Sequence, residues 1–280
     1  MNRFLAYLRL ELRNLFARPR WLLPIPLVLF IAYRSTNGVR VLSTSYGVSD
    51  NGWDALLYAL SSADVVYFVL STLFLYLLAD LAFEPAYGQW ALLRLGSRRS
   101  WWWSKCLSVL LATLGYVALV MATLVAFISL RMTWQGQWSE MIVPSMHFIE
   151  LGLTKEVMSS SPVVIAIQHV ALLTLGWLAF GLLVTTVTLL TQRALAGFLS
   201  GAVVLLSGYF GIYIAGREPA EFPYTLLIHN HLEYTPGPYP LRTTSVTFSI
   251  LYWVVWILIL VGVGYVASQR QDLLASDRQN

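Results

Sequence analysis

Hydrophobic and polar positions fall in long blocks along this chain rather than alternating residue by residue. Six apolar segments, almost free of charged residues, are separated by shorter polar stretches. They run over residues 21–37, 63–82, 106–130, 162–190, 194–215 and 246–267. Since about 20 apolar residues cross a bilayer as a helix, the pattern predicts an all-α, polytopic membrane protein with six transmembrane helices in a single transmembrane domain.

The first apolar segment is the weakest of the six. Pro24 and Pro26 restrict its start, and Arg34 interrupts it. The Arg34 side chain can snorkel to the interface, which lets the span reach Asn37. Residues 38–62 then form a polar outer loop. A re-entrant hairpin is the competing interpretation, because the apolar stretch is short.

Residues 1–20 have the pattern of an amphipathic helix. One face of the helical wheel is apolar, and it comprises Met1, Phe4, Leu5, Leu8, Leu12, Leu15 and Phe16. The basic residues Arg3, Arg9, Arg13, Arg18 and Arg20 lie elsewhere on the wheel. This pattern predicts an interfacial helix with basic residues toward anionic lipid headgroups. A soluble helix packed on a partner protein is the alternative.

The arginine and lysine distribution predicts the orientation. With both termini inside, twelve basic residues fall on the inner side, namely Arg3, Arg9, Arg13, Arg18, Arg20, Arg94, Arg98, Arg99, Lys105, Arg193, Arg270 and Arg278. Six fall outside, namely Arg34, Arg40, Arg131, Lys155, Arg217 and Arg242. The excess favours both termini in the cytoplasm, by the positive-inside rule. The net charge of +4 therefore does not indicate nucleic-acid binding.

Composition excludes a built-in ATPase of the usual kind. Charged residues are only 11% of the chain, and the six spans leave no room for a soluble catalytic domain. A phosphate-binding loop ends in Lys-Ser or Lys-Thr, yet Lys105 precedes Cys106 and Lys155 precedes Glu156. No zinc-protease or nucleophile-elbow motif is found either. Any ATP that drives this protein is therefore hydrolysed by another polypeptide.

The connection between the second and third spans, residues 83–105, differs from the other connections. It reads FEPAYGQWALLRLGSRRSWWWSK and lies in the cytoplasm by the topology above. A short amphipathic stretch, Gln89–Leu95, precedes a Gly96-Ser97 break and the basic pair Arg98-Arg99. A short helix here offers apolar side chains to a protein docked beneath the membrane. An ordinary anchoring loop is the alternative interpretation.

This connection resembles that of the membrane subunits of ABC type-2 exporters. The resemblance rests on Glu84, Gly88, Leu92-Leu93, Ser97-Arg98, Trp101–Trp103 and Lys105, together with the six-span plan. It implies that residues 84–94 form a coupling helix seated in a groove of an ATPase subunit. The residues that it assigns to ATPase coupling are Glu84, Gly88, Trp90, Leu92, Leu93, Arg94 and Arg98. The long outer connections depart from a minimal permease and leave the substrate open.

Few polar residues inside the spans suggest chemistry. Asp80 lies near the inner end of the second span, where a pairing with arginine is favoured over a functional role. Asp64 is expected at the outer edge, in contact with solvent. His169 is expected to bond a neighbouring backbone or hydroxyl group. His229, His231 and Glu233 alternate in an outer loop, but no further ligand cluster accompanies them. Gly197 and Gly201 indicate close helix packing, within the subunit or across a dimer.

The resemblance implies the permease subunit of an ATP-driven exporter in the cytoplasmic membrane of a bacterium. Two permease subunits, identical or different, work with two separate ATPase subunits. ATP and Mg²⁺ are bound by those partners, and no cofactor or metal is expected in this chain. The expected cargo is amphipathic or hydrophobic, such as a peptide antibiotic, a drug or a lipid-like molecule. A polytopic membrane enzyme or a non-transporting immunity protein is the alternative.

Overall fold

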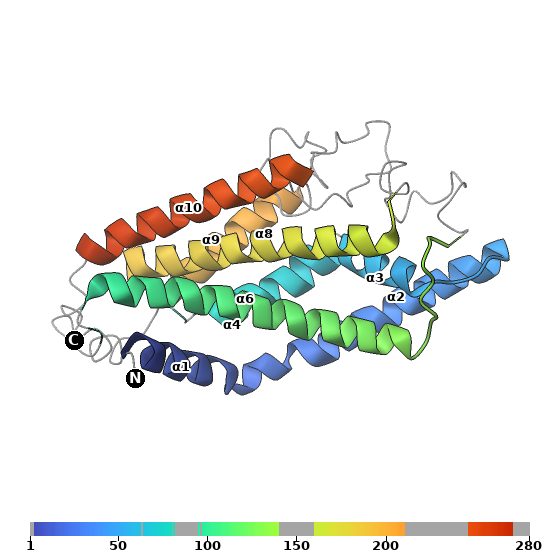
Figure 1. Ribbon diagram of the computed structural model, residues 1–280, viewed down its shortest axis with the longest axis horizontal. Coiled ribbons are helices and arrows are strands. Elements are labelled where there is room, and N and C mark those ends of the chain that lie inside the picture. The colour runs from blue at the N-terminus through green and yellow to red at the C-terminus, as the bar shows by residue number, and fades with distance from the viewer. Residues whose placement is uncertain are drawn as a thin grey trace.

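The computed structural model describes residues 3–62, 64–79, 81, 95, 97–139, 160–210 and 246–270, without the side chains of Tyr46 and Ser61. These residues form an elongated helical bundle, with no strand among them (Figure 1). The elements are α1 (Arg3–Phe16), the 3-10 helix η1 (Pro19–Leu22), α2 (Pro24–Tyr46), α3 (Gly52–Ser61), the π-helix η2 (Val65–Ser71), α4 (Thr72–Leu78), α6 (Arg98–Ser129), α8 (Pro162–Thr191), α9 (Ala194–Tyr209) and α10 (Val246–Arg270).

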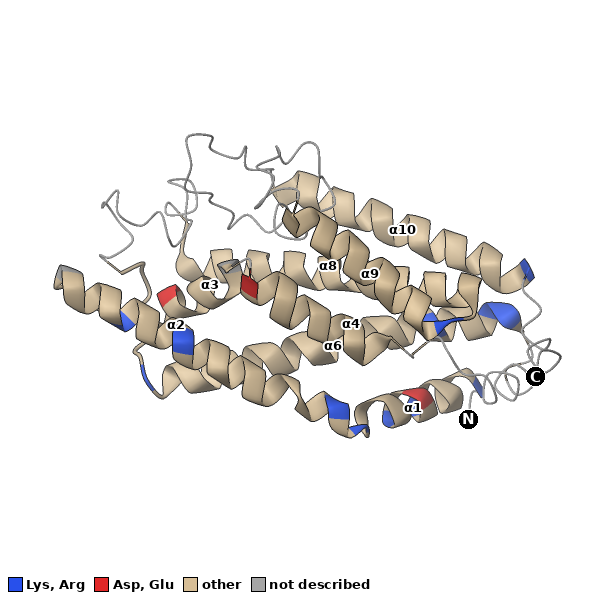
Figure 2. Cartoon of the chain, turned by 180° about the vertical axis from the view of Figure 1, so that it is seen from behind, with Lys and Arg blue, Asp and Glu red and all other residues tan. Residues whose placement is uncertain are grey.

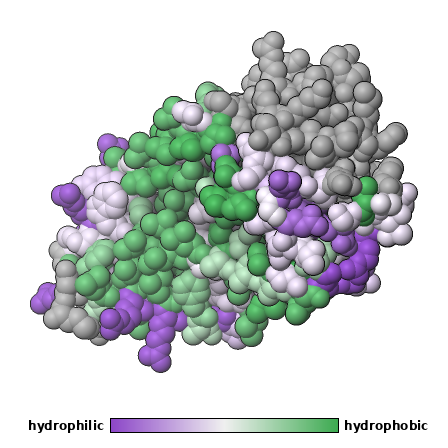
Figure 3. All heavy atoms as spheres, turned by 45° about the vertical axis from the view of Figure 1, so that its right-hand side comes forward, coloured by the Kyte–Doolittle hydropathy of each residue, from purple (hydrophilic) through white to green (hydrophobic). Residues whose placement is uncertain are grey.

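Four described stretches are long and apolar enough to cross a membrane. They are Pro19–Ser45, which joins η1 and α2, and the helices α6, α8 and α10. A fifth is possible, because α3 and the η2–α4 segment pass the same test together, although they meet at 78°. A broad apolar band covers the surface, with polar residues on either side of it (Figure 3). The prediction of an all-helical membrane protein is therefore confirmed.

Local signals set the helix boundaries. The Ser97 hydroxyl accepts a hydrogen bond from the Ser100 amide at 3.1 Å and caps the start of α6. Ser161 caps α8 in the same way, just before Pro162 at the first helical position. At the other ends, Gly47 closes α2 in the left-handed region (φ 68°), and Gln192 closes α8 with φ 56°.

The helix of the first span runs past Asn37, where the sequence pattern placed the end of the span. Helix α2 continues to Tyr46, and α3 forms within the stretch predicted as a polar loop. The polar side chains do not break α2, because their hydroxyl groups bond back to carbonyls of the same helix. Those hydroxyl donors are Ser35, Thr36, Ser43, Thr44 and Ser45. Tyr58 of α3 packs against α2 at Gly38.

The third span also begins earlier than hydropathy predicts. Helix α6 starts at Arg98 rather than at residue 106, so the tryptophan triplet lies inside it. Trp101 and Trp102 are buried, and only Trp103 is exposed. The Trp102 indole donates to the Val261 carbonyl of α10 at 3.0 Å. Trp101 and Trp102 therefore pack helices together.

Helix α8 forms the centre of the bundle and packs on α3, α4, α6, α9 and α10. Glycine allows the closest approaches: a Cβ at Gly197 or Gly201 of α9 would meet atoms of Val184 on α8. The two glycines predicted to mediate packing therefore do so within this chain. Phe74, Tyr116 and Trp177 join their rings in the core, with centroids 5.2–6.0 Å apart.

Charged residues separate toward the two ends of the bundle (Figure 2). The α1 end consists of α1, the first turns of α6, the α8–α9 turn and the last turn of α10. It carries Arg3, Arg9, Arg13, Arg98, Arg99, Lys105, Arg193 and Arg270, with Glu11 as its acidic residue among those described. The described aspartates Asp50, Asp54 and Asp64 lie at the opposite end, beside α3, where Arg40 pairs with Asp50 and bonds the Arg131 carbonyl.

Candidate functional site

The α1 end carries the part of the predicted coupling region that can be located. Glu84, Gly88, Trp90, Leu92, Leu93 and Arg94 lie outside the described residues, as does Asp80. Arg98 is described and opens α6. Its guanidinium donates to the Gln269 carbonyl of α10 at 2.8 Å. Arg98 therefore ties the end of the predicted connection to the last turn of the final helix.

Lys105, the last residue of that connection, is fully buried. Its ammonium lies 2.5 Å from the Glu11 carboxylate of α1. It also donates to the Leu81 carbonyl at 2.9 Å, and it lies 5.7 Å from the centre of the Trp101 ring. A buried charge is tolerated only when it is paired and hydrogen-bonded, and this lysine is both.

Glu11 completes the arrangement from the other side. Its side chain is 3% exposed, and its second carboxylate oxygen accepts a hydrogen bond from the Ser108 hydroxyl at 2.8 Å. Ser108 lies one turn after Lys105 on α6. We call Glu11, Leu81, Lys105 and Ser108 the Lys105 node. It joins α1, the end of the second span and the start of the third.

The whole length of α1 runs alongside the first half of α6. Tyr7 packs in one cluster with Trp101, Glu11 bonds Lys105, and Phe16 lies against Gly115. Helix α1 therefore packs on α6 of the same chain. Leu5 and Phe16 stay exposed on α1, at 55% and 41%.

Sequence reasoning missed Glu11. The available signal was a single acidic residue within a strongly basic helix, matched by a lysine at the start of a span. Lysine occurs only at positions 105 and 155 of this arginine-rich chain. A compact ammonium group suits one buried carboxylate and one carbonyl better than a planar guanidinium does. The pairing itself could not be read without the fold, because 94 positions separate the two residues.

The second span begins with a π-helix, and neighbouring helices bond to it. The Tyr116 hydroxyl of α6 donates to the Leu70 carbonyl at 2.7 Å. The Trp177 indole of α8 donates to the Ser71 hydroxyl at 2.9 Å, and Thr72 donates to the Tyr67 carbonyl. π-Helical turns often mark functional segments, and this one joins the Lys105 node through α4.

The remaining candidate residues are placed as follows. The Nε2 atom of His169 lies 3.1 Å from the Leu60 carbonyl, which bears out the expected backbone partner. Asp64 is exposed and accepts a hydrogen bond from the Tyr209 hydroxyl at 2.7 Å. The described residues contain no group of three His, Cys, Asp or Glu that could hold a metal. His229, His231 and Glu233 lie outside the described residues.

The comparisons with known proteins add one match. Residues 21–274 match the family model described as "Protein of unknown function (DUF2705)". No curated protein and no solved structure matches the chain. The match covers every described helix from α2 to α10 and the whole predicted connection.

Proposed function

Because the chain belongs to the DUF2705 family of unknown function, we propose from its own residues that it is the membrane-spanning permease subunit of an ATP-driven ABC exporter. Two permease subunits work with two ATPase subunits, which bind ATP and Mg²⁺. The cargo is amphipathic or hydrophobic, and the protein resides in the cytoplasmic membrane of a bacterium. The chain itself performs no catalysis.

The proposed topology has six spans, with both termini in the cytoplasm. The η2–α4 segment, which meets α3 at a bend, supplies the second span. The apolar segment 194–215, which contains α9, supplies the fifth. The concentration of arginine at the α1 end supports its placement on the cytoplasmic side, since basic residues are retained there.

The Lys105 node is the observation that carries the proposal. Residues 83–104 lie between Leu81 and Lys105, and the Lys105 ammonium donates a hydrogen bond to the Leu81 carbonyl. The two ends of this segment are therefore fixed to each other, and a partner that pulls on the segment pulls on both ends. The same ammonium holds Glu11, so any displacement reaches α1 as well as the second and third spans. A rigid anchor is what an energy-coupling connection needs, since a flexible one would absorb the motion.

ATP binding shifts the permease only if the ATPase dimer prefers one permease conformation over another. The proposed contact with residues 84–94 provides that preference. Trp90, Leu92 and Leu93 supply the apolar side chains for the ATPase groove, and Arg94 and Arg98 supply the charges. The anchored connection then converts closure of the ATPase dimer into movement of the second and third spans.

The test reconstitutes the chain with its ATPase in proteoliposomes and measures ATP hydrolysis. We expect Leu93→Pro and Arg94→Glu each to lower the permease-dependent hydrolysis by about tenfold, equivalent to ~1.4 kcal/mol of coupling, while membrane insertion is unchanged. Arg270→Glu, at an exposed site on the last turn of α10, is the matched control and should retain full activity. Full hydrolysis in both connection variants contradicts the proposal.

A further inference from the structure

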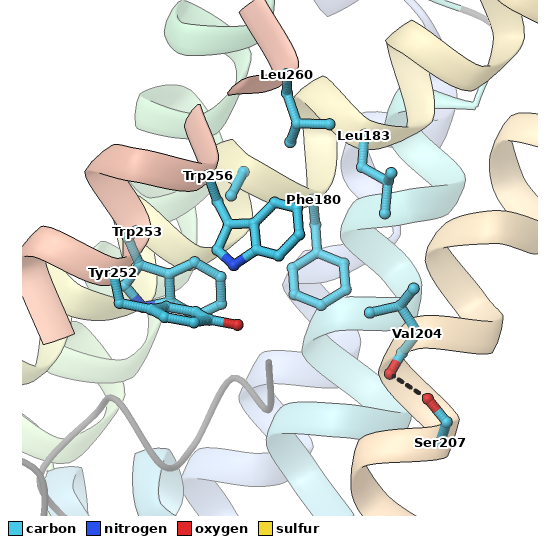
Figure 4. A pocket seen from close by; sticks show the side chains of 9 residues that line it. Phe180, Leu183, Val204, Ser207, Tyr252, Trp253, Trp256 and Leu260 are labelled. Carbon is cyan, nitrogen blue, oxygen red and sulfur yellow. Dashed lines mark hydrogen bonds between the residues drawn. The ribbon is translucent and has the colours of Figure 1, made fainter. Parts of the chain in front are cut away.

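An apolar cavity opens between α8, α9 and α10, away from the Lys105 node (Figure 4). Its volume is about 380 Å³, within the range of about 300–1,000 Å³ that is usual for ligand sites. Side chains from the three helices converge on it: Ala179, Phe180 and Leu183 of α8, Val204 and Ser207 of α9, and Tyr252, Trp253, Trp256 and Leu260 of α10.

Polar atoms form a small part of the lining, namely the hydroxyl groups of Ser207 and Tyr252 and the indole nitrogens of Trp253 and Trp256. Ser207 donates its hydroxyl hydrogen to the Val204 carbonyl of its own helix at 3.0 Å, as the dashed line in Figure 4 shows. Sites for drug-like molecules carry placed polar groups that fix orientation. A cavity lined mostly by carbon atoms suits an occupant that makes few hydrogen bonds.

The rim of the cavity continues onto the surface that faces the bilayer. Trp256 lines the cavity and is 41% exposed. Val203 and Val255, which neighbour the lining on α9 and α10, are 64% and 52% exposed. These helices present apolar side chains to the hydrocarbon region, so a chain of the bilayer can enter sideways without crossing a polar layer.

We propose that this cavity binds one acyl chain of a membrane lipid, held between α8, α9 and α10. The concave shape, the aromatic lining and the open lipid-facing rim carry the inference. A flexible hydrocarbon chain gains dispersion contacts with Phe180, Trp253 and Trp256, because their rings surround it on several sides. Binding requires neither ATP nor an ATPase, so the site stands independently of the exporter function.

Two neighbouring residues of α9 give a matched pair of variants. Val204 lines the cavity, whereas Val203 is not among the lining residues and is exposed. Val204→Trp fills the space that the acyl chain would occupy. Val203→Trp adds the same side chain to the same helix on the lipid side. Trp256→Ala widens the cavity and keeps its apolar character.

The experiment uses the full chain in phosphatidylglycerol vesicles that contain a trace of phospholipid with a photoactivatable group near the end of one acyl chain. After irradiation, the labelled peptides are mapped and quantified by mass spectrometry. We expect adducts on the lining residues of α8 and α10, reduced about tenfold by Val204→Trp and changed less than about twofold by Val203→Trp.

Equal labelling of the lining residues in wild type and Val204→Trp overturns the proposal, as does labelling confined to the exposed residues of α10. If Val204→Trp does not fold, Ser207→Phe fills the same space from the same helix and replaces it. Loss of labelling together with a change in the dimer fraction shows a second copy seated on the cavity, which also overturns the lipid site. None of these results depends on ATP hydrolysis.

Discussion

The buried ion pair of Lys105 and Glu11 joins α6 to α1 and affects the stability of the fold. Burying two charges costs several kcal/mol each, and their attraction repays that cost only with good geometry and further hydrogen bonds. Here Ser108 and the Leu81 carbonyl supply those bonds. The pair is therefore tolerated as a unit, and either residue alone is not.

We predict that Lys105→Met lowers the free energy of unfolding by about 3–5 kcal/mol, because the Glu11 carboxylate is left buried and unpaired. The double variant Glu11→Leu, Lys105→Met should recover most of that loss, since it removes both charges. Unfolding by sodium dodecyl sulfate in mixed micelles measures the difference. Arg99→Met, at an exposed position on the same helix, should change stability by less than about 0.5 kcal/mol. A double variant no more stable than Lys105→Met contradicts the account.

At the other end of the bundle, Asn51 has a comparable role. It is fully buried at the start of α3. Its amide donates to the Gln137 carbonyl at 2.8 Å, and its oxygen accepts from the Gln135 and Trp53 amides. One side chain therefore caps α3 and holds residues 135–137 over it.

Asn51→Ala should lower the free energy of unfolding by about 1–3 kcal/mol, because it leaves buried backbone groups without partners. Hydrogen exchange should rise at residues 133–137 and at the first turn of α3. Ser45→Ala removes only a bond within α2 and is the control. Unchanged exchange at residues 133–137 in Asn51→Ala would show that the side chain does not hold this segment.

Among the elements, the second span departs furthest from a regular helix. Its π-helical start, Val65–Ser71, is bonded by Tyr116 of α6 and Trp177 of α8. Both donors come from helices that meet it only in the folded bundle. The irregular backbone is thus maintained by tertiary contacts, as is expected where backbone groups lie away from water.

We predict that Trp177→Phe increases hydrogen exchange in the Leu70–Thr72 segment, because it removes the bond to the Ser71 hydroxyl. The loss of stability should be about 0.6 kcal/mol and no more than about 1.7 kcal/mol, the range for hydrogen bonds between membrane helices. Trp103→Phe changes an exposed ring and should leave exchange in this segment unaltered. Mass spectrometry of exchanged peptides in nanodiscs gives the readout.

Some helices could be predicted from the sequence, because residues at their ends and within them carry the signal. Helix α8 spans Pro162–Thr191 where residues 162–190 were expected, because Ser161 and Pro162 mark its start and its interior is uniformly apolar. Helix α2 could not be bounded in this way, since its hydroxyl groups satisfy themselves within the helix. The bend between α3 and η2 could not be predicted from hydropathy either, because hydropathy reports how apolar a segment is and not the direction in which its helix runs.

The candidate site was predictable only in part, for a related reason. Hydropathy and charge located the connection at residues 83–105, and Lys105 was included as its last residue. The partners of Lys105 come from α1 and from the end of the second span. Contacts between distant segments depend on how helices pack, and no local pattern encodes that packing.

At the scale of the whole molecule, the Lys105 node and the proposed acyl-chain cavity lie in different parts of the bundle. The α1 end gathers arginines, the Lys105 node and the ends of the connection. The acyl-chain cavity lies between α8, α9 and α10. Helix α8 contacts both parts of the bundle, since it packs on α4 and α6 as well as on α9 and α10. A movement that starts at the connection therefore has a packed route to the lipid-facing helices.

The most direct test of the exporter account is a cross-link between the connection and an ATPase. In a Cys106→Ser background, which removes the only cysteine, Trp90→Cys is compared with Gly136→Cys. A side chain at Gly136 meets no neighbour within 4 Å, and this residue lies near α3 at the opposite end. The account predicts that W90C cross-links to an ATP-binding polypeptide and resists a membrane-impermeant thiol reagent in intact cells, whereas G136C shows the reverse. Labelling of W90C from outside, or no cross-link to an ATPase, would contradict it.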